Sequence, residues 1–335
     1  MTMAKPQTSM PFPGSPPAAT QPRSVSVIIP TFRRPDGLAL ATDSVLRQTA
    51  LNGVAVSLVI CDNSPEASAR AYVADLAARA EIAMTYVHEP KTGVANARNS
   101  AVATATAHFA AEFIAFLDDD EEAPPYWLAT LLSTQAQFQA DVVFGPVCAR
   151  LADGDTRFPT YFETFFSRKG PAQSQRLDAY YGCGNSLIRS CHLTQSRKPF
   201  DTDHNEMGGE DDKLFHGLQA AGAVMAWAAE ALVYEDVPAS RSTLDYTLRR
   251  AFAYGQGPSF SAALSRRPLT CAAWMLQGVA QGVLFSLFGG VLWMIGSRQS
   301  APRLDKAMRG FGKAIWFPPF KIGFYGQALL RNASH

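Results

Sequence analysis

The sequence FIAFLDDDEE at residues 113–122 is the most informative stretch of the chain, because an apolar run gives way at once to five carboxylates. A continuous apolar run bounded by polar residues is typical of a strand that is buried on both faces. In an open α/β sheet, ligands bind in the crevice beyond the carboxyl ends of such strands. Asp118, Asp119 and Asp120 repel one another there, and a divalent cation would neutralise them, since hard cations prefer carboxylate oxygens. An acidic turn that caps a helix starting near Pro124 explains the same residues without a metal, so both interpretations stay open.

Strand-like runs alternate with helical patterns on both sides of this stretch. The predicted strands cover residues 25–30, 54–60, 82–87, 113–117 and 141–144, and helical patterns separate them. This alternation predicts βαβ units and a doubly wound, mostly parallel α/β sheet. The polar segments after successive strands therefore meet at one edge; they are residues 31–34, 62–64, 88–92 and 118–122. No GxGxxG follows the first strand, which argues against a dinucleotide-binding fingerprint.

Beyond Arg150 the alternation loosens. Residues 151–177 are rich in aromatic side chains and predict a long loop or lid. Residues 180–188 predict a strand with two glycines, which would allow a ligand to approach the backbone closely. Further on, the patterns predict extended segments at 224–227 and 231–234, a helix opening at 208–212, and a helix over 244–254.

Bulk composition excludes several classes of protein. The chain has 335 residues, with 30 Lys and Arg against 29 Asp and Glu, so no basic excess favours nucleic acid as a partner. Its five cysteines form no CxxC pattern, which favours a reducing compartment. Residues 1–23 are rich in Pro, Ser, Thr and Ala and predict a disordered tail.

Five segments occur in an order that resembles the family 2 glycosyltransferases, which have the GT-A fold. They are VIIPTFRR at 27–34, DNS at 62–64, GVANARN at 93–99, DDD at 118–120 and ED at 210–211. The resemblance runs from about residue 25 to about residue 255 and is strongest to bacterial enzymes that build exopolysaccharide or other surface glycans. It implies a nucleotide-sugar-binding half over 24–150 and an acceptor-binding, catalytic half over 151–260 of one GT-A domain. The family's Gln-x-x-Arg-Trp segment is not present, and Arg249 and Arg250 occupy a comparable place.

The resemblance also implies roles for individual residues. Asp120, and after it Asp118, would bind Mg²⁺ or Mn²⁺, while Asp211, with Glu210 as the fallback, would be the general base of an inverting transfer from a nucleotide-diphosphate sugar, with UDP the expected nucleotide. The residues implied for donor binding are Pro30, Thr31, Arg33, Asp62, Lys91, Arg98, Asp118, Asp119, Arg249 and Arg250. Glu235 and Arg241 are further candidates, for the metal and the diphosphate.

Several of these residues also have structural explanations that need no ligand. Asp62 is also placed to cap a turn before Pro65, and Arg98 would otherwise be a solvated residue on an alanine-rich helix. Glu210 and Asp211 would otherwise be ordinary acids in the first turn of a helix.

The C-terminal part carries a long apolar segment. Residues 268–297 contain no Asp, Glu, Lys, Arg or His, and their length permits a membrane span, with Trp274 and Trp293 near its ends. A re-entrant hairpin broken near Gly289 and Gly290, a helix in the membrane interface, and a buried helix of a soluble protein are the alternatives. We expect residues 261–335 to associate with the cytoplasmic face of the bacterial inner membrane, where a glycan or lipid-linked acceptor would be met.

Two other functions fit parts of the pattern. A nucleotidyltransferase also binds phosphates with acids and metal, but it should carry a glycine-rich basic loop after the first strand, which residues 30–34 do not resemble. A catalytically degenerate scaffold in a glycan-assembly complex agrees with the missing Gln-x-x-Arg-Trp segment. The intact Asp120 and Asp211 argue against that scaffold.

Overall fold

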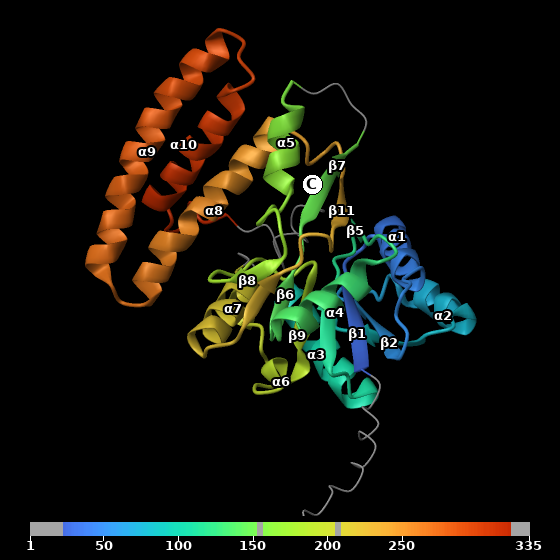
Figure 1. Cartoon of the computed structure of the whole chain (residues 1–335). Coiled ribbons are helices and arrows are strands. Elements are labelled where there is room, and N and C mark those ends of the chain that lie inside the picture. The colour runs from blue at the N-terminus through green and yellow to red at the C-terminus, as the bar shows by residue number, and fades with distance from the viewer. Residues whose placement is uncertain (1–22, 153–156, 205–208, 323–335) are drawn as a thin grey trace, which may run out of the picture.

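An α/β body and a helical arm make up the computed structural model, which describes residues 23–152, 157–204 and 209–322 (Figure 1). The body is built on an eight-stranded sheet in the order β3-β2-β1-β4-β9-β6-β10-β8. Its strands are β1 (Arg23–Thr31), β2 (Val54–Asp62), β3 (Ala83–His88), β4 (Phe113–Phe116), β6 (Val142–Phe144), β8 (Gln175–Leu177), β9 (Ser186–Arg189) and β10 (Met225–Trp227). The tail predicted for residues 1–23 lies, except for Arg23, outside the described residues.

The predicted doubly wound α/β architecture is confirmed. Strands β3, β2, β1 and β4 are parallel neighbours. Helices α1 (Pro35–Leu46), α2 (Arg70–Arg79) and α4 (Trp127–Phe138) contribute to the apolar core on one face of the sheet. Helices α3 (Val94–Phe109) and α7 (Glu210–Ala220) contribute to the core on the other face. The carboxyl ends of the parallel strands therefore share one edge, as the sequence predicted.

The middle of the sheet departs from the predicted parallel order. Strand β9 runs antiparallel between β4 and β6, and β8 runs antiparallel to β10 at the sheet edge. The strand predicted over 180–188 begins only at Ser186, because Asn185 has a left-handed backbone conformation (φ 47°) that no extended strand accommodates. The predicted lid over 151–177 contains helix α5 (Pro159–Phe166) as well as β8.

A second, three-stranded sheet was not predicted. It consists of β5 (Glu121–Glu122), β11 (Val233–Val237) and β7 (Val147–Leu151), with β11 in the middle. Helix α4 begins at Trp127 and has no side-chain cap, so the aspartates at 118–120 do not cap it. The acidic run instead leads from one sheet into the other.

Three long helices form the arm at the side of the body (Figure 1). They are α8 (Leu244–Leu264), α9 (Pro268–Met294) and α10 (Ser300–Ala314). The alternative of a re-entrant hairpin broken near Gly289 and Gly290 is wrong, since α9 is continuous. Its glycines permit close packing on α10: a Cβ at Gly282 would lie 2.6 Å from the ring of Phe311.

Helix α9 is the one helix in the described ranges that is long and apolar enough to cross a membrane, with a mean hydropathy of 1.5 in its most apolar window. Only 17% of that window is buried, so the alternative of a buried core helix is wrong. The remaining short helices are α6 (Ser190–Leu193) and the 3₁₀ turn η1 (Thr202–His204).

Candidate functional site

A cleft of about 1750 Å³ opens along the carboxyl edge of the sheet. The loop after β1, the acidic segment after β4, the glycine-containing segment at 182–184 and the start of α7 all line it. Helix α8 forms a further wall. The structure thus brings the motifs at 27–34, 93–99, 118–120 and 210–211 to one place. Convergence was predicted for the segments at 31–34, 62–64, 88–92 and 118–122, and each of these contributes at least one residue to the lining.

Asp119 is held by the loop after β1. The Thr31 hydroxyl donates to its carboxylate at 2.8 Å, the amide of Phe32 donates at 3.3 Å, and a guanidinium N–H of Arg34 donates at 2.8 Å. Burial raises the pKa of Asp119 to about 6, against the opposing charge of Arg34. Asp119 therefore ties the β1 loop to the acidic segment, and few of its lone pairs remain for a ligand.

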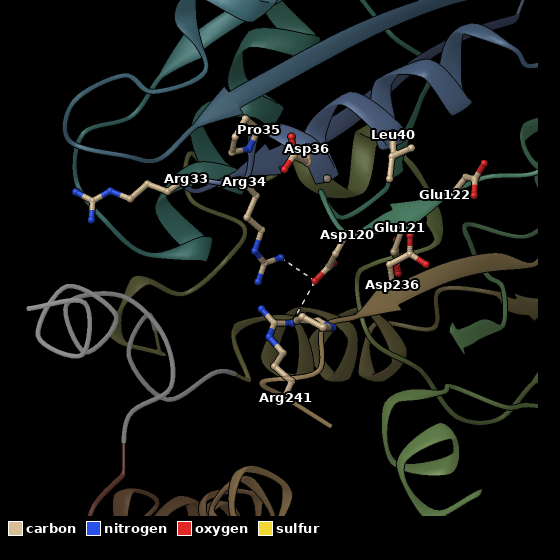
Figure 2. Close-up of a pocket in the computed structure, with 12 residues that line it drawn as sticks. Arg33, Arg34, Pro35, Asp36, Leu40, Asp120, Glu121, Glu122, Asp236 and Arg241 are labelled. Carbon is tan, nitrogen blue, oxygen red and sulfur yellow. Dashed lines mark hydrogen bonds and ion pairs between the residues drawn. The ribbon is translucent and has the colours of Figure 1, made fainter. Parts of the chain in front are cut away.

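Asp120 lies between two arginines. Arg34 donates to its carboxylate at 2.7 Å and Arg241 donates to the same oxygen at 3.3 Å (Figure 2). The backbone is fixed as well, because the amide of Asp236 on β11 donates to the Asp120 carbonyl at 3.1 Å. These residues also border a smaller pocket of about 420 Å³. Arg34 was quoted in the first motif without a role of its own, and it proves to be the link between Asp119 and Asp120.

Arg98 joins the acidic tip to Glu210, the fallback base and the neighbour of Asp211. One of its terminal nitrogens donates to Glu210 at 2.5 Å and the other donates to Asp118 at 3.3 Å. Arg98 is 6% exposed, so the alternative of a solvated helix residue is wrong. Burial raises the pKa of Glu210 to about 7, even though the charge of Arg98 acts in the opposite direction. Two buried polar atoms, Arg98 Nε and Glu210 Oε2, have no partner in the part of the chain that the structure describes.

Glu210 and Asp211 differ sharply in their surroundings. Glu210 is 4% exposed and paired with Arg98, whereas Asp211 is half-buried on the cleft wall. The Asp211 carboxylate accepts from the amide of Cys183 at 3.0 Å and from the amide of Asp212 at 3.0 Å. Asp212 is exposed. These contacts orient Asp211 without neutralising it by an ion pair.

Arg168 is a site residue that the sequence did not predict. It is half-buried in the segment after α5, and its guanidinium donates to the carbonyls of Gly182 at 2.8 Å and of Gly184, and to the Gly145 carbonyl at 3.2 Å. It thereby fixes the segment whose next amide, that of Cys183, binds Asp211. No local motif marks Arg168, since its partners lie elsewhere in the chain.

The other predicted donor-binding residues divide into two groups. Pro30, Thr31, Arg33, Arg249 and Arg250 line the cleft. Arg33 pairs with Glu66 at 2.6 Å, and Arg249 pairs with Asp245 at 3.0 Å. Arg250 donates to the hydroxyls of Tyr254 at 2.6 Å and Tyr246 at 3.0 Å.

Asp62 and Lys91 are not among the residues that line the cleft. Asp62 is fully buried and accepts from the amide and hydroxyl of Ser64, the amide of Ala69 and the Tyr86 hydroxyl. This is the turn-capping arrangement that was the alternative explanation, and the base-binding role of Asp62 stays a prediction. Asn63 lines the cleft in its place and accepts from the Gly93 amide at 2.7 Å.

The carboxylates of the tip suit a hard cation that is held partly by a substrate. Among the described ranges, no group of three or more His, Cys, Asp and Glu side chains forms a ready-made metal site. Asp118 and Asp120 nevertheless present oxygen donors to the cleft, with side chains that are 36% and 20% exposed. Mg²⁺ is commonly bound by one or two carboxylates together with substrate phosphates and water, so this donor set fits Mg²⁺ or Mn²⁺.

Glu235 on β11 also borders the tip. Burial, together with the charge of Asp120, raises its pKa to about 7. Its placement agrees with the third-ligand role considered from the sequence, which stays a prediction.

Comparison with known proteins places this arrangement in a family. Residues 26–195 match the glycosyl transferase family 2 domain. The chain is 32% identical over 232 residues to the succinoglycan biosynthesis protein ExoM of Rhizobium meliloti (strain 1021), a match that covers 69% of this chain and 73% of ExoM. The chain therefore belongs to glycosyltransferase family 2 and is a glycosyltransferase.

One further relative and one solved structure extend the comparison. The pre-mycofactocin glycosyltransferase of Mycobacterium tuberculosis (strain CDC 1551 / Oshkosh) is 27% identical over 310 residues, covering 88% of this chain and 60% of that protein's length. The crystal structure of S. aureus TarS 1-349 in complex with UDP superposes with a TM-score of 0.50 at 13% identity, covering 87% of this chain and 90% of that one. At that identity the likeness supports the GT-A fold alone.

Proposed function

We propose that this glycosyltransferase moves a sugar from a nucleotide-diphosphate donor, with UDP the expected nucleotide, to a hydroxyl acceptor with inversion at C1. The observation that carries the proposal is the bridge through Arg98, which ties Asp118 of the acidic tip to Glu210, the neighbour of Asp211, within one cleft. An inverting transfer needs the groups that bind the diphosphate and the general base on opposite sides of the transferred sugar. The acidic tip would supply the first and Asp211 the second.

Asp211 is the proposed general base. It takes the proton from the acceptor hydroxyl while that oxygen forms a bond to C1 of the sugar, and the bond from C1 to the diphosphate oxygen breaks. A single displacement of this kind gives a product of inverted configuration and a free nucleoside diphosphate. Glu210 is less suited to the role because it is buried and paired with Arg98, and we assign it to positioning Arg98.

Cationic side chains would bind the departing diphosphate. Arg34, Arg98 and Arg241 each pair with a carboxylate of the tip, and Arg250 lines the same cleft. Their charges favour the product-like state, in which negative charge has moved onto the diphosphate. Asp120 and Asp118 would hold Mg²⁺ or Mn²⁺, which neutralises charge on the same diphosphate when it is bound. Pro30, Thr31 and Arg33 would frame the nucleoside, and Lys91 stays a weaker candidate for the diphosphate.

The relatives support a setting for this activity. ExoM is named for succinoglycan biosynthesis, and the TarS structure was determined with UDP. Helix α9 presents an apolar, mostly exposed face that suits a membrane. We infer that the chain builds a surface polysaccharide at the cytoplasmic face of the inner membrane, on a glycan or lipid-linked acceptor.

A screen of nucleotide sugars scored by release of nucleoside diphosphate tests the proposal. We expect one UDP-sugar to be turned over with release of UDP when Mg²⁺ or Mn²⁺ is present. Release of inorganic diphosphate from a nucleoside triphosphate and a sugar phosphate would instead identify a nucleotidyltransferase. Failure to bind or turn over any nucleotide sugar would favour the scaffold.

A further inference from the structure

Helix α9 has two opposite faces of different character. Its buried residues recur at intervals of seven and four, and the glycines among them pack on α10; they are Cys271, Gly278, Gly282 and Gly289. Apolar residues that are at least 50% exposed recur at the same intervals about half a turn away; they are Leu269, Leu276, Val283, Leu287 and Met294. This outer face runs along a helix of 27 residues, or about 40 Å, and carries no charge.

The arm is strongly basic, although the whole chain is nearly neutral. Residues 261–335 contain nine Lys and Arg against one Asp, whereas the whole chain has 30 Lys and Arg against 29 Asp and Glu. The single acid, Asp305, is buried and accepts from Arg309 at 2.7 Å and from the Tyr161 hydroxyl at 3.2 Å. The rest of the chain is therefore acidic, so an anionic surface would attract the arm and repel the body.

Two lysines of α10 lie beside α9. The ammonium of Lys306 is 5.4 Å from the centre of the Phe285 ring, and that of Lys313 is 5.3 Å from the centre of the Trp274 ring. Phe285 lies nine residues, or about 14 Å, from the end of α9. If α9 crossed a bilayer with α10 packed against it, Lys306 would lie near the middle of a hydrocarbon layer about 30 Å thick, where a charge is strongly unfavourable.

Both ends of α9 are tied to the rest of the chain. At its start, α9 follows α8 after three residues. Near its end, the Trp293 ring lies 4.5 Å from the guanidinium of Arg157 and 5.8 Å from the ring of Phe158, both in the segment that leads into α5. A crossing helix would carry one end to the far side of the membrane and break one of these connections. The packing of the arm therefore suits a helix that lies in the plane of a membrane.

The three helices of the arm lie in layers, with α10 between α9 and α8 (Figure 1). A Cβ at Gly312 of α10 would lie 2.1 Å from the carbonyl oxygen of Phe252 on α8, and one at Gly310 would lie 2.5 Å from the amide nitrogen of Gly282 on α9. The order from the outside is thus an apolar helix, a basic helix, and a helix that lines the cleft. This order matches that of hydrocarbon, lipid headgroups and cytosol at a membrane surface.

We propose that the arm docks flat on an anionic phospholipid surface. The outer face of α9 enters the hydrocarbon boundary, and basic side chains beside it bind lipid phosphates. These include Lys306 and Lys313 on α10, and the exposed Arg266, Arg267 and Arg298 at the two ends of α9. Both ends of α9 then stay on the same side of the membrane. The proposal deepens the proposed membrane location of the enzyme and does not depend on sugar transfer.

Flotation of the full-length chain with phosphatidylcholine vesicles, with and without phosphatidylglycerol, tests the lipid chemistry. We expect at least about tenfold stronger partition onto the vesicles that contain phosphatidylglycerol, because each basic residue near an anionic surface adds attraction. Equal partition onto both kinds of vesicle, or no partition onto either, would overturn the proposal.

Paired substitutions locate the contact. Arg266→Gln together with Arg267→Gln should weaken partition onto the anionic vesicles by roughly tenfold. Arg197→Gln together with Lys198→Gln removes two adjacent, exposed basic residues of the body and should leave partition as it was. An equal loss in both double variants would mean that net charge alone brings the chain to the surface, which contradicts docking through the arm.

Fluorophores on the outer face distinguish flat docking from crossing. Val283→Cys and Met294→Cys are each labelled with nitrobenzoxadiazole in a Cys191→Ser chain, which lacks the exposed one of the five cysteines. Flat docking predicts the same depth of about 5–10 Å for both labels, measured by quenching with spin-labelled lipids, and reduction of both by dithionite added outside the vesicles. A crossing helix would place the Val283 label near the bilayer centre and protect the Met294 label from dithionite. Either that result or labels that the lipids do not quench would overturn the proposal.

Titration of UDP into the same samples tests the proposed function separately. If UDP binds while the chain ignores anionic vesicles or crosses the bilayer, only the docking proposal fails. If the arm docks flat and UDP does not bind, the proposed function fails and the docking proposal stands.

Discussion

The α/β body and the arm formed by α8, α9 and α10 place apolar and charged residues in opposite ways. In the body, Phe113, Phe116 and Trp127 are almost wholly buried, and charged groups such as Arg98 and Glu210 are buried as a pair at the cleft. In the arm, Leu276 is 73% exposed. A monomeric soluble protein rarely exposes a continuous apolar surface of such length, so the arm's outer face is built for contact and the body's edge for chemistry.

The helices of the arm pack through residues that have no side chain. Gly278 and Gly282 on α9 face Gly310 on α10, where added Cβ atoms would approach backbone atoms to about 2.5 Å. Small residues at this spacing let helix backbones approach closely, as they do inside membranes. The large apolar side chains of α9 are thereby left on its outer face.

Removal of the proposed general base should have the largest effect, and it tests the chemistry assigned to the cleft of the body. Asp211→Asn should lower turnover by roughly 10²–10⁴-fold, because a positioned general base contributes about that much, while UDP affinity stays the same. Asp212→Asn changes the exposed neighbour by the same atom and should leave turnover unchanged. Steady-state UDP release measures both. Full activity in Asp211→Asn would move the base to Glu210 or to another group.

A single charge placed on α9 tests whether the outer face of the arm contacts a membrane. Leu284→Arg, near the middle of α9 and 61% exposed, should sharply reduce association with liposomes, since a central arginine costs about 2.5–3.5 kcal/mol on membrane insertion. Leu40→Arg places the same charge on an exposed leucine of the body and should leave partition unchanged. Flotation of both variants with anionic liposomes is the measurement. Equal flotation would show that α9 does not meet the membrane.

A larger side chain at a glycine between α9 and α10 tests how closely these two helices pack. Gly282→Leu should lower the free energy of unfolding by about 1–3 kcal/mol, because the new side chain meets the ring of Phe311. Gly290→Leu points into open space and should not destabilise the chain. Denaturant unfolding in detergent compares them. A stable Gly282→Leu variant would mean that α9 and α10 are not packed as described.

The smallest expected effect is a pH dependence of the free energy of unfolding, which Glu235 in the cleft should cause. The pKa of Glu235 is raised to about 7, above the value of about 4.3 for an unfolded glutamate, so between these values the folded chain retains a proton that the unfolded chain releases. The free energy of unfolding should therefore fall as the pH rises through this window, by about 1–3 kcal/mol. Glu235→Gln should flatten this slope, and Glu81→Gln on the surface is the control for removing one carboxylate. An unchanged slope in Glu235→Gln would contradict the burial of this carboxyl group.

Much of the body could be predicted from the sequence because its signals are local. Strands β1 to β4 lie in runs rich in apolar residues, and the polar residues that follow them meet at one edge for geometric reasons. The antiparallel insertion of β9 and the second sheet were missed, since β5 has only two residues and its partner β11 lies more than a hundred residues further on. Strands this short show no periodicity, and their pairing is decided by tertiary contacts.

The candidate site shows the same limit. The tip and the Glu210-Asp211 pair were predicted, and the structure brings them together. Other contacts join residues far apart in the sequence, and no motif indicates them. They are the ion pairs of Asp120 with Arg34 and Arg241, and the hydrogen bonds of Arg168 to the segment at 182–184. Asp62 carries a family signature, yet its carboxylate is occupied by its own turn.

Titration of UDP into the full-length chain with and without Mn²⁺, repeated with Asp120→Ala, tests whether the acidic tip binds the diphosphate through a metal. Mn²⁺ should tighten UDP binding in the unaltered chain and have no effect in Asp120→Ala. UDP binding that is the same with and without Mn²⁺, or a Mn²⁺ effect that survives in Asp120→Ala, would contradict the assignment of the acidic tip to a metal-bound diphosphate.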